Sequence, residues 1–408
     1  MNILFVSQYF PPEMGAPAAR MVEFSRRWAG AGHSVSVLTA FPHHPVGKLY
    51  PGHRIRFFHR SRYGRIRLFR SWIYITANKG IVRRSFSYLS FAVCAVINSR
   101  RLPRQDVLIA TSPQFLCALA GFVISKLKKM PFILEIRDLW PDSIVAVGAM
   151  QDGLIIAILK KIERFLYKKA DKIVVVTESF RDYIIARGIS EAKIVHVPNG
   201  IDSKACREYV FRTEIPSQSG MARKLTVAYI GTMGMAHGLE TVLEAAIILK
   251  DVLFLLIGEG AEKDKLMKLA ERNNLRNVIF IGRQPREQIP GWIRKTDACI
   301  VHLKNTPLFD TVIPSKIFEI MGCGRPLLLG TKGESRRLVE KAKAGFFFEP
   351  EDRDGLVSAI RRLIQNPQSG RKMGASGRRF VQKHYDLDHL AEHYLNSAIR
   401  PVLGVSHG

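Results

Sequence analysis

The feature that most constrains the fold is a series of short, predominantly apolar runs, each followed by a helical pattern. They span residues 2–7, 34–39, 106–110, 132–136 and 172–176 in the first half, and 225–231, 252–257, 278–281, 298–302, 326–329 and 345–348 in the second. Strands without an exposed polar face are typical of a parallel sheet buried on both sides. Their alternation with helices predicts doubly wound α/β architecture.

The series is interrupted once, near the middle of the 408-residue chain. Residues 196–202 are rich in turn formers, and residues 203–223 are polar and irregular, as in a linker. A chain of this length has room for two domains, each with its own core. We therefore predict two Rossmann-like domains, residues 1–202 and 203–385, and a C-terminal helix, 386–408, that crosses back to the first domain.

Charge is distributed unevenly. The formal net charge is +27, and between Glu23 and Asp106 there are 16 Lys or Arg and no carboxylate. A basic surface of this size attracts polyanions such as nucleic acid, anionic lipid headgroups or phosphorylated substrates. Charge alone does not choose among these three partners.

The basic segment 48–70 mixes arginine with aromatic residues and precedes an apolar helix, residues 85–98. The helix is shorter than the roughly 20 residues that a membrane span needs. Interleaved arginines and rings suit single-stranded nucleic acid or a lipid headgroup layer, and a basic, solvated β-hairpin beside a core helix is the alternative. The arginines that we expect to face a membrane are Arg62, Arg65, Arg67 and Arg70.

Metal and cofactor signals are weak. The five cysteines are scattered without metal-ligand or redox spacing, which indicates reduced thiols. The Asp-x-Asp pattern at Asp386–Asp388 lies in a polar helical tail and is interpreted as a helix cap. No leader pattern precedes the first strand. We expect a cytoplasmic protein with no metal and no cofactor.

Three strands of the second half end in glycine, at Gly231, Gly258 and Gly282. Ligands bind beyond the carboxyl ends of such strands, where glycine lets a phosphate or base approach the backbone. Glu259 lies at one of these ends and is a candidate contact for a ligand, or an ordinary turn carboxylate.

Residues 311–327 hold the strongest candidate site. Pro314 suits the first turn of a helix, whose free N–H groups and a lysine would form an anion site for a diphosphate. Glu319 lies on the same helical face as that lysine, where its carboxylate can accept hydrogen bonds from a ribose diol; an ordinary Lys–Glu pair on a solvated helix is the alternative. The expected anion-binding residues are Val312, Ile313, Ser315 and Lys316.

The same stretch resembles the donor-site signature of the retaining GT-B glycosyltransferases, particularly glycosyltransferase family 4. The family's second glutamate and following Met-Ala-Cys-Gly-x-Pro are matched by Glu319, Met321, Gly322, Cys323, Gly324 and Pro326. Thr311 stands where the family has an earlier glutamate. Pro314-Ser315-Lys316 resembles instead the branch that includes the fucosamine transferases of O-antigen synthesis.

The resemblance covers nearly the whole chain and implies further site residues. Residues 11–15, ending at Gly15, resemble the N-terminal glycine loop where donor phosphate and acceptor meet, and residues 198–202 resemble the interdomain hinge. Asp138, after the strand 132–136, lies in a motif of the same branch and is implied in catalysis or acceptor binding, or is a cap or partner of Arg137.

Two loops of the second half also correspond to donor-binding loops of the family. Thr232 and His237 occupy the position of its phosphate clamp, but both clamp cations are missing, so that Lys316 is left to neutralise the diphosphate. Arg283 matches the position where the family holds the nucleobase through backbone groups.

The resemblance implies a retaining, metal-independent transferase that uses a UDP-sugar donor. The implied acceptor is a lipid-linked saccharide at the anionic inner membrane surface, in O-antigen or capsule synthesis, with the protein attached peripherally and no nucleic-acid partner. The basic residues are then interpreted as membrane-facing. Two alternatives stay open: a nucleotide-sugar 2-epimerase of the same fold, and a nucleic-acid-binding α/β protein.

Overall fold

The structure is a computed structural model in which the chain forms two compact units. Unit 1 comprises Met1–Pro198 and Leu387–Gly408, and unit 2 comprises Asn199–Asp386. The residues described are 1–13, 16–43, 47–76, 81–112, 115–146, 148, 150–151, 153–204, 206 and 225–404. Most of the expected linker 203–223 lies outside them.

Unit 1 is built on an eight-stranded sheet in the order β3-β4-β2-β1-β5-β6-β7-β8. Neighbouring strands are parallel, except that β3 pairs antiparallel with β4. The predicted parallel α/β class is therefore confirmed, with a hairpin at one edge. The strands are β1 Asn2–Val6, β2 Ser34–Ala40, β3 Phe58–Tyr63, β4 Ile66–Ser71, β5 Val107–Ser112, β6 Phe132–Ile136, β7 Lys172–Val175 and β8 Ile194–His196.

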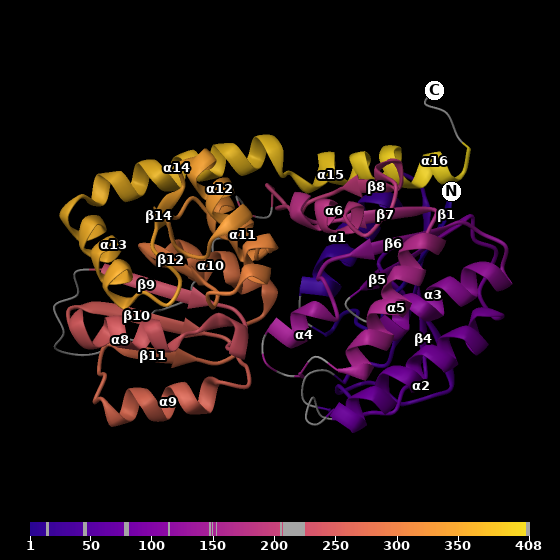
Figure 1. Cartoon of the computed structure of the whole chain (residues 1–408), viewed down its shortest axis with the longest axis horizontal. Helices are drawn as coiled ribbons and strands as arrows, with labels where there is room; N and C mark the ends of the chain where they lie inside the picture. Colours follow the sequence, from indigo (N-terminus) through magenta and orange to yellow (C-terminus); the bar gives the residue numbers. More distant parts are fainter. Residues whose placement is uncertain are drawn as a thin grey trace. The chain divides into compact units, whose positions relative to one another are not determined.

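Helices cover both faces of this sheet (Figure 1). On one face α1 packs through Phe24 and Trp28 against alternate strand residues such as Phe5 and Val37. On the other face α2, α3 and α5 lie in a layer with α3 packed against both of the others. The helices are α1 Ala16–Gly30, α2 Ile81–Ser99, α3 Phe115–Leu127, α4 Asp142–Ala146, α5 Leu154–Lys169, α6 Glu178–Ile185 and the 3-10 turn η1 Glu191–Lys193.

The C-terminal segment belongs to unit 1, along which it runs in yellow in Figure 1. It consists of α15 Leu387–Tyr394, the π-helical turn η5 Leu395–Ile399 and α16 Arg400–Val402. Trp28 donates its indole N–H to the Ala391 carbonyl at 2.9 Å, and its ring stacks on Tyr394 with centroids 5.2 Å apart. Asp388, which we interpreted as a cap, forms an ion pair with Arg27 at 2.7 Å.

Unit 2 is built on a six-stranded parallel sheet in the order β11-β10-β9-β12-β13-β14. Unit 2 begins at Asn199, before the expected boundary at residue 203, because Ile201 donates its N–H to Tyr385 at 2.9 Å and packs in the core of unit 2. The strands are β9 Leu225–Ile230, β10 Val252–Ile257, β11 Val278–Ile281, β12 Ala298–His302, β13 Leu327–Gly330 and β14 Gly345–Phe347.

The two faces of this sheet carry different helices. Val227 and Tyr229 of β9 face the core under α8, α9 and α13, whereas Ala228 and Ile230 face the core under α10, α11 and α12. The helical elements are η2 Met235–His237, α8 Glu240–Ile248, α9 Lys263–Arg272, η3 Arg286–Gln288, α10 Ile289–Lys295, η4 Pro307–Thr311, α11 Lys316–Gly322, α12 Gly333–Ala342, α13 Arg353–Gln365 and α14 Pro367–His384.

Strand order places a topological switch point in unit 2. After β9 the chain adds β10 and β11 on one side, and then β12, β13 and β14 on the other. The connections leaving β9 and β12 therefore diverge, and a ligand can bind between them at the carboxyl edge of the sheet. No helix in the described part of the chain is long and apolar enough to cross a membrane.

Candidate functional site

The carboxyl end of β9 is shaped by two glycines. Gly231 has φ of +146°, and Gly258, at the end of β10, has φ of +144°. A side chain on Gly258 would overlap the Gly231 carbonyl, and the two strand ends are joined by the Gly231 N–H, which donates to Ile257 at 2.9 Å. The backbone is therefore open to a ligand at this edge of the sheet.

Lys316 reaches this point from the other face of the sheet. It begins α11, and its Nζ lies 4.0 Å from the centre of the Tyr229 ring. A Cβ at Gly231 would lie 2.5 Å from that Nζ, so only glycine leaves room for the lysine to cross the strand end. Among the described residues the Lys316 Nζ has no hydrogen-bond partner and no ion pair, although it is buried. Burial lowers the pKa of Lys316 to about 7.

His237 lies beside Lys316 and is held by a second histidine. The His302 Nδ1 donates to the His237 carbonyl at 2.6 Å, and the His302 Nε2 accepts from the Glu351 N–H at 2.9 Å. His302 is therefore a neutral imidazole with both nitrogens satisfied. Burial and nearby Lys316 lower the pKa of His237 to about 3, so His237 brings shape but no positive charge to the site.

The start of the signature motif differs in detail from the prediction. The expected free N–H of Val312 instead donates to the Phe309 carbonyl at 3.2 Å, because η4 ends there. Within the described chain, the N–H groups of Ile313, Ser315 and Lys316 have no protein acceptor. The helix α11 has only seven residues and begins at Lys316, so its dipole is small and the ammonium group is the main positive charge.

Glu319 lies one turn along α11 from Lys316. Its side chain is half-buried and close enough to Lys316 to favour the charged form of the amine. The helix continues through Gly322 because the Cys323 N–H donates to the Glu319 carbonyl at 3.0 Å. Thr232, by contrast, is exposed, and it is the Thr232 carbonyl that accepts from the Tyr229 hydroxyl at 2.6 Å.

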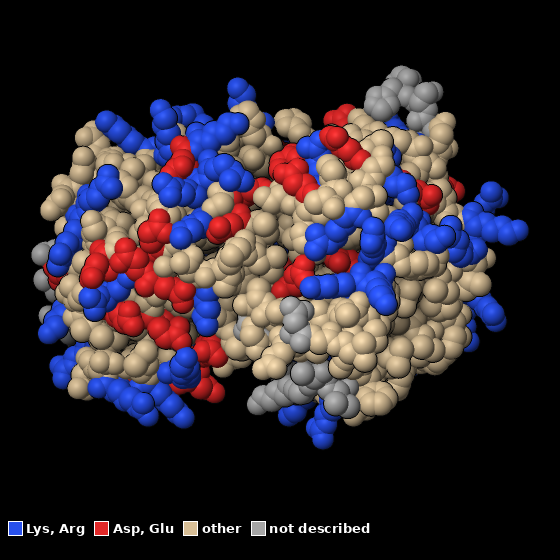
Figure 2. Space-filling model, in the orientation of Figure 1, with Lys and Arg blue, Asp and Glu red and all other residues tan. Residues whose placement is uncertain are grey.

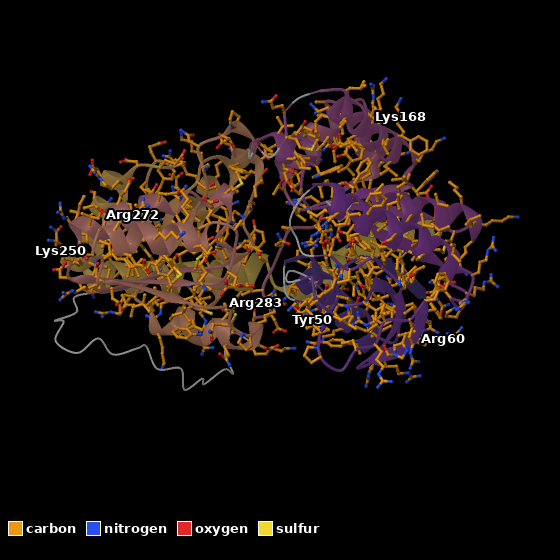
Figure 3. The ribbon with its side chains drawn as sticks, turned by 90° about the horizontal axis from the view of Figure 1, so that it is seen from below. Tyr50, Arg60, Lys168, Lys250, Arg272 and Arg283 are labelled. Atoms are coloured by element: carbon orange, nitrogen blue, oxygen red, sulfur yellow. The ribbon has the colours of Figure 1, made fainter. Side chains whose placement is uncertain are left out.

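Glu259 and Arg283 follow β10 and β11 at the same edge of the sheet. Glu259 forms an ion pair with Lys263 at 2.6 Å, which agrees with the turn-carboxylate alternative. Arg283 is half-buried. In Figure 3 it lies at the opposite end of unit 2 from Lys250, which precedes β10, as the strand direction requires.

Two predicted residues belong to unit 1. Asp138 follows β6, and its Oδ2 accepts from the Ser143 hydroxyl at 3.0 Å within the turn that leads into α4. Burial raises the pKa of Asp138 despite that hydrogen bond and nearby Arg137. Gly15 lies outside the described residues. The neighbouring Glu13 accepts from the His43 N–H at 2.9 Å, and the structure thus ties part of the predicted glycine loop to the end of β2.

The predicted membrane-facing arginines do not form one surface. Arg62 and Arg65 are exposed at the β3–β4 turn, and Arg67 donates to the Ser34 hydroxyl. Arg70 is 2% exposed and donates to the carbonyls of Ala40 and Pro11, both at 2.7 Å. The membrane-facing prediction is therefore wrong for Arg70, because its position on β4 points it into unit 1.

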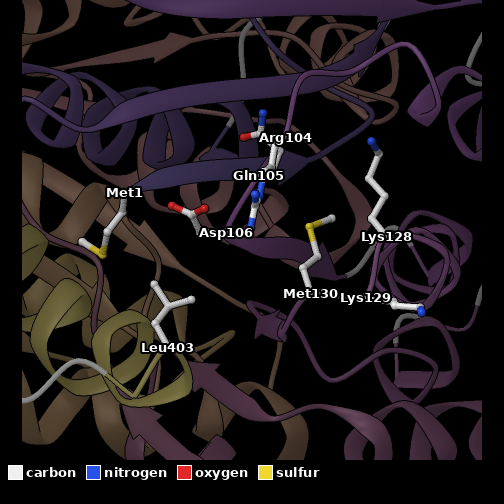
Figure 4. A pocket seen from close by; sticks show the side chains of 8 residues that line it. All are labelled: Met1, Arg104, Gln105, Asp106, Lys128, Lys129, Met130 and Leu403. Atoms are coloured by element: carbon white, nitrogen blue, oxygen red, sulfur yellow. The ribbon is translucent and has the colours of Figure 1, made fainter.

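Positive charge is instead prominent elsewhere on unit 1. Figure 2 shows basic side chains gathered over α5, which contributes Lys160, Lys161, Arg164, Lys168 and Lys169. A basic cavity of about 710 Å³ lies at the amino edge of the unit 1 sheet, away from the carboxyl ends of the strands (Figure 4). Its lining residues are Met1, Arg104, Gln105, Asp106, Lys128, Lys129, Met130 and Leu403.

The sequence interpretation missed two residues that shape the surroundings of Lys316 and His237, namely Tyr229 and His302. His302 is the polar last residue of the otherwise apolar strand β12, whereas Tyr229 is next to last in β9. For His302 that position was the available signal, since ligands bind beyond the carboxyl ends of the strands in a parallel sheet. Among the described residues no group of three or more His, Cys, Asp or Glu is placed to hold a metal ion.

Two doubly wound parallel units, one with a buried cation at its switch point, define an α/β protein of the GT-B class. Two family models match: a glycosyl transferase 4-like domain over residues 15–200 and the glycosyl transferases group 1 over residues 211–380. The chain therefore belongs to the GT-B glycosyltransferases that combine these two domains, and it is related to enzymes of surface polysaccharide synthesis.

Individual relatives agree with this assignment. The chain is 25% identical over 417 residues to WcaI of Escherichia coli K12, named as a colanic acid biosynthesis glycosyl transferase, with 97% of this chain and 99% of that protein covered. Sucrose-phosphate synthase of Thermosynechococcus elongatus has a similar fold, with TM-score 0.76, 19% identity and coverage of 99% and 100%. Anabaena HepE, solved with UDP and glucose, has TM-score 0.68, 17% identity and coverage of 96% and 97%.

Proposed function

We propose that the chain transfers a sugar from a UDP-sugar to a lipid-linked saccharide at the anionic inner face of the cell membrane. Transfer proceeds with retention of anomeric configuration and without a metal ion. The donor class is supported by the fold neighbour that was solved with UDP, and the acceptor class by the relative named for colanic acid biosynthesis. Retention is supported by the resemblance of the motif around Glu319.

The observation that carries this proposal is the buried, unpaired ammonium of Lys316 at the β9 switch point. A buried cation without a partner is costly unless a ligand brings the opposite charge. The diphosphate of the donor supplies that charge, and the N–H groups of Ile313 and Ser315 can add hydrogen bonds. Since His237 is neutral, Lys316 is the residue that neutralises the charge of the diphosphate.

The remaining predicted residues take roles consistent with their positions. Glu319, one turn from Lys316, accepts from the ribose hydroxyls, and the backbone around Arg283 contacts the nucleobase. Asp138 belongs to unit 1, which carries the domain that the family resemblance assigns to the acceptor, and it acts on the acceptor side of the reaction.

Membrane attachment is assigned to α2 and α5 rather than to the β3–β4 hairpin. One side of α2 exposes Phe86, Leu89, Val93 and Ile97, which are 48–60% exposed; we call these four residues the α2 stripe. The first turns of α5 expose Leu154 and Ile155, at 79% and 61%, ahead of its five basic residues. Exposed apolar residues flanked by cations suit an anionic bilayer surface.

Calorimetric titration with UDP in the presence of EDTA tests the donor site. We expect Lys316→Ala to weaken UDP binding by about 1.5–3 kcal/mol, the range for a hydrogen bond to a charged group, and to cut turnover by orders of magnitude. Lys341→Ala is the matched control, because Lys341 is an exposed lysine near the end of α12. The control should bind UDP like the natural protein.

Wild-type UDP affinity in Lys316→Ala would show that the diphosphate binds elsewhere. Binding that is lost in EDTA and restored by a divalent cation would contradict the metal-independent reaction. Conversion of the nucleotide sugar to its epimer without release of UDP would indicate the epimerase instead of the transferase.

A further inference from the structure

The Lys316 side chain has unusual surroundings. Its amine crosses the carboxyl edge of the sheet over Gly231 and ends above the face of Tyr229, 4.0 Å from the ring centre. The ring is fixed, because the strand β9 holds its backbone and the Thr232 carbonyl accepts its hydroxyl at 2.6 Å. Tyr229 is 1% exposed, so its ring cannot be replaced by water in the intact fold.

The ionisable groups that face Lys316 come from four elements. They are Tyr229 of β9, His237 of η2, Cys299 of β12 and Glu319 of α11. Neutral His237 and the protonated thiol of Cys299, whose pKa burial raises to about 11, supply no negative charge near neutral pH. Glu319 favours the charged amine, but burial is the larger effect and lowers the pKa of Lys316 to about 7.

We infer that Tyr229 is a positioning residue that holds Lys316 for the donor, and that Lys316 takes up a proton when a nucleotide diphosphate binds. The inference rests on the proposed role of Lys316. The ring offers its negative face to the amine without the full charge of a carboxylate. The amine is therefore kept in place but not neutralised, and the bound diphosphate becomes its counter-ion.

The proton transfer can be followed without any acceptor substrate. In the empty site the Lys316 amine is largely uncharged at pH 8, and a bound diphosphate shifts it to the ammonium form, which draws one proton from the buffer. Because the diphosphate binds the protonated amine, the affinity for UDP falls as pH rises above about 7. At pH 6 the amine is already charged and uptake disappears.

The experiment is UDP titration calorimetry at pH 6 and pH 8, each in two buffers of different ionisation enthalpy. For the natural protein we expect uptake approaching one proton at pH 8 and close to none at pH 6. Tyr229→Phe keeps the ring and should preserve both affinity and uptake. Tyr229→Leu removes the ring and admits water, so uptake at pH 8 should fall by at least half and affinity roughly tenfold.

The outcomes separate this inference from the proposed function. If Lys316→Ala binds UDP normally, the donor site itself is misplaced. If Lys316→Ala loses binding but Tyr229→Leu keeps wild-type affinity and uptake, Tyr229 does not position the lysine. Should Tyr229→Leu fail to fold, the natural protein still tests the proton uptake by Lys316. A binding enthalpy at pH 8 that does not depend on the buffer would contradict that uptake.

Discussion

Two buried cations, one in each unit, show how burial serves different purposes. Arg20 is 5% exposed and donates to Glu135 and to the carbonyls of Pro198 and Val197, all at 2.7 Å. Its charge and donors are used within the fold, so it stabilises the link between α1, β6 and the end of unit 1. The Lys316 Nζ is also buried, yet it has no such partners in the described chain, which leaves its charge for a ligand.

Glu319 gives a second test at the scale of one residue. We expect Glu319→Ala to weaken UDP binding by about 1–3 kcal/mol, because a carboxylate that accepts from a ribose diol forms a charge-assisted hydrogen bond. The natural protein should also prefer UDP to 2′-deoxy-UDP, and the variant should lose that preference. Calorimetry with both nucleotides measures the coupling between the side chain and the hydroxyl.

Glu340→Ala is the control for this prediction, since Glu340 lies on the exposed face of α12, where its carboxylate pairs with Arg336 at 2.8 Å. It should leave both affinities unchanged. An unaltered preference for the ribose 2′-hydroxyl in Glu319→Ala would assign the ribose to another residue.

Much of the site was accessible from sequence because it lies within one short motif. The spacing of Lys316 and Glu319 placed both on one helix at a strand edge, as the structure has them. Tyr229 and the buried state of Arg70 were not accessible in this way. Both depend on which face of a strand meets which helix, and that is set by packing between segments far apart in the chain.

At the scale of elements, the buried strands were predicted most accurately. β6, β10 and β11 have the predicted bounds, because predominantly apolar runs between turn residues have few alternatives in a parallel sheet. The apolar helix at residues 85–98 was harder: in the structure it extends to Ile81–Ser99 and packs against the sheet while exposing the α2 stripe. Hydrophobicity alone does not show which apolar side of α2 packs against the sheet and which side is exposed.

The α2 stripe carries a prediction of its own. Replacing Phe86 and Val93 with serine should weaken binding to anionic vesicles by about 1 kcal/mol or more for each side chain, because each loses apolar area that would enter the lipid. Thermal stability should change little, since both residues are exposed. Vesicle sedimentation and a thermal melt measure the two effects.

A control helix is available in unit 2. Ile247 of α8 is 41% exposed, and Ile247→Ser should leave vesicle binding unchanged. Unchanged sedimentation of the double variant of Phe86 and Val93 would contradict docking through α2.

At the scale of the whole molecule, the net charge of +27 makes weak attraction to any polyanion unavoidable. The salt dependence of binding distinguishes a lipid surface from a nucleic acid as the partner. Binding to oligonucleotides should fall steeply between 50 and 200 mM salt, about as expected for counterion release, whereas vesicle binding should keep an apolar part that salt does not screen. We therefore expect anionic vesicles to retain the protein at salt concentrations that release random oligonucleotides.

Competition sedimentation with both ligands provides this measurement. Equal sedimentation with neutral and anionic vesicles would remove the electrostatic contribution. Preferential retention of oligonucleotides at high salt would favour the nucleic-acid-binding alternative.

The return of the C-terminal segment to unit 1 affects how the protein is made. Unit 2 is one continuous stretch of chain, but the core of unit 1 contains Leu387, Leu390 and Tyr394. On the ribosome these residues emerge only after all of unit 2. Unit 2 can therefore complete its core during translation, whereas unit 1, although synthesised first, keeps apolar surface on α1 uncovered until residues 387–399 arrive. We therefore expect the earliest part of the nascent chain to expose apolar surface for the longest time.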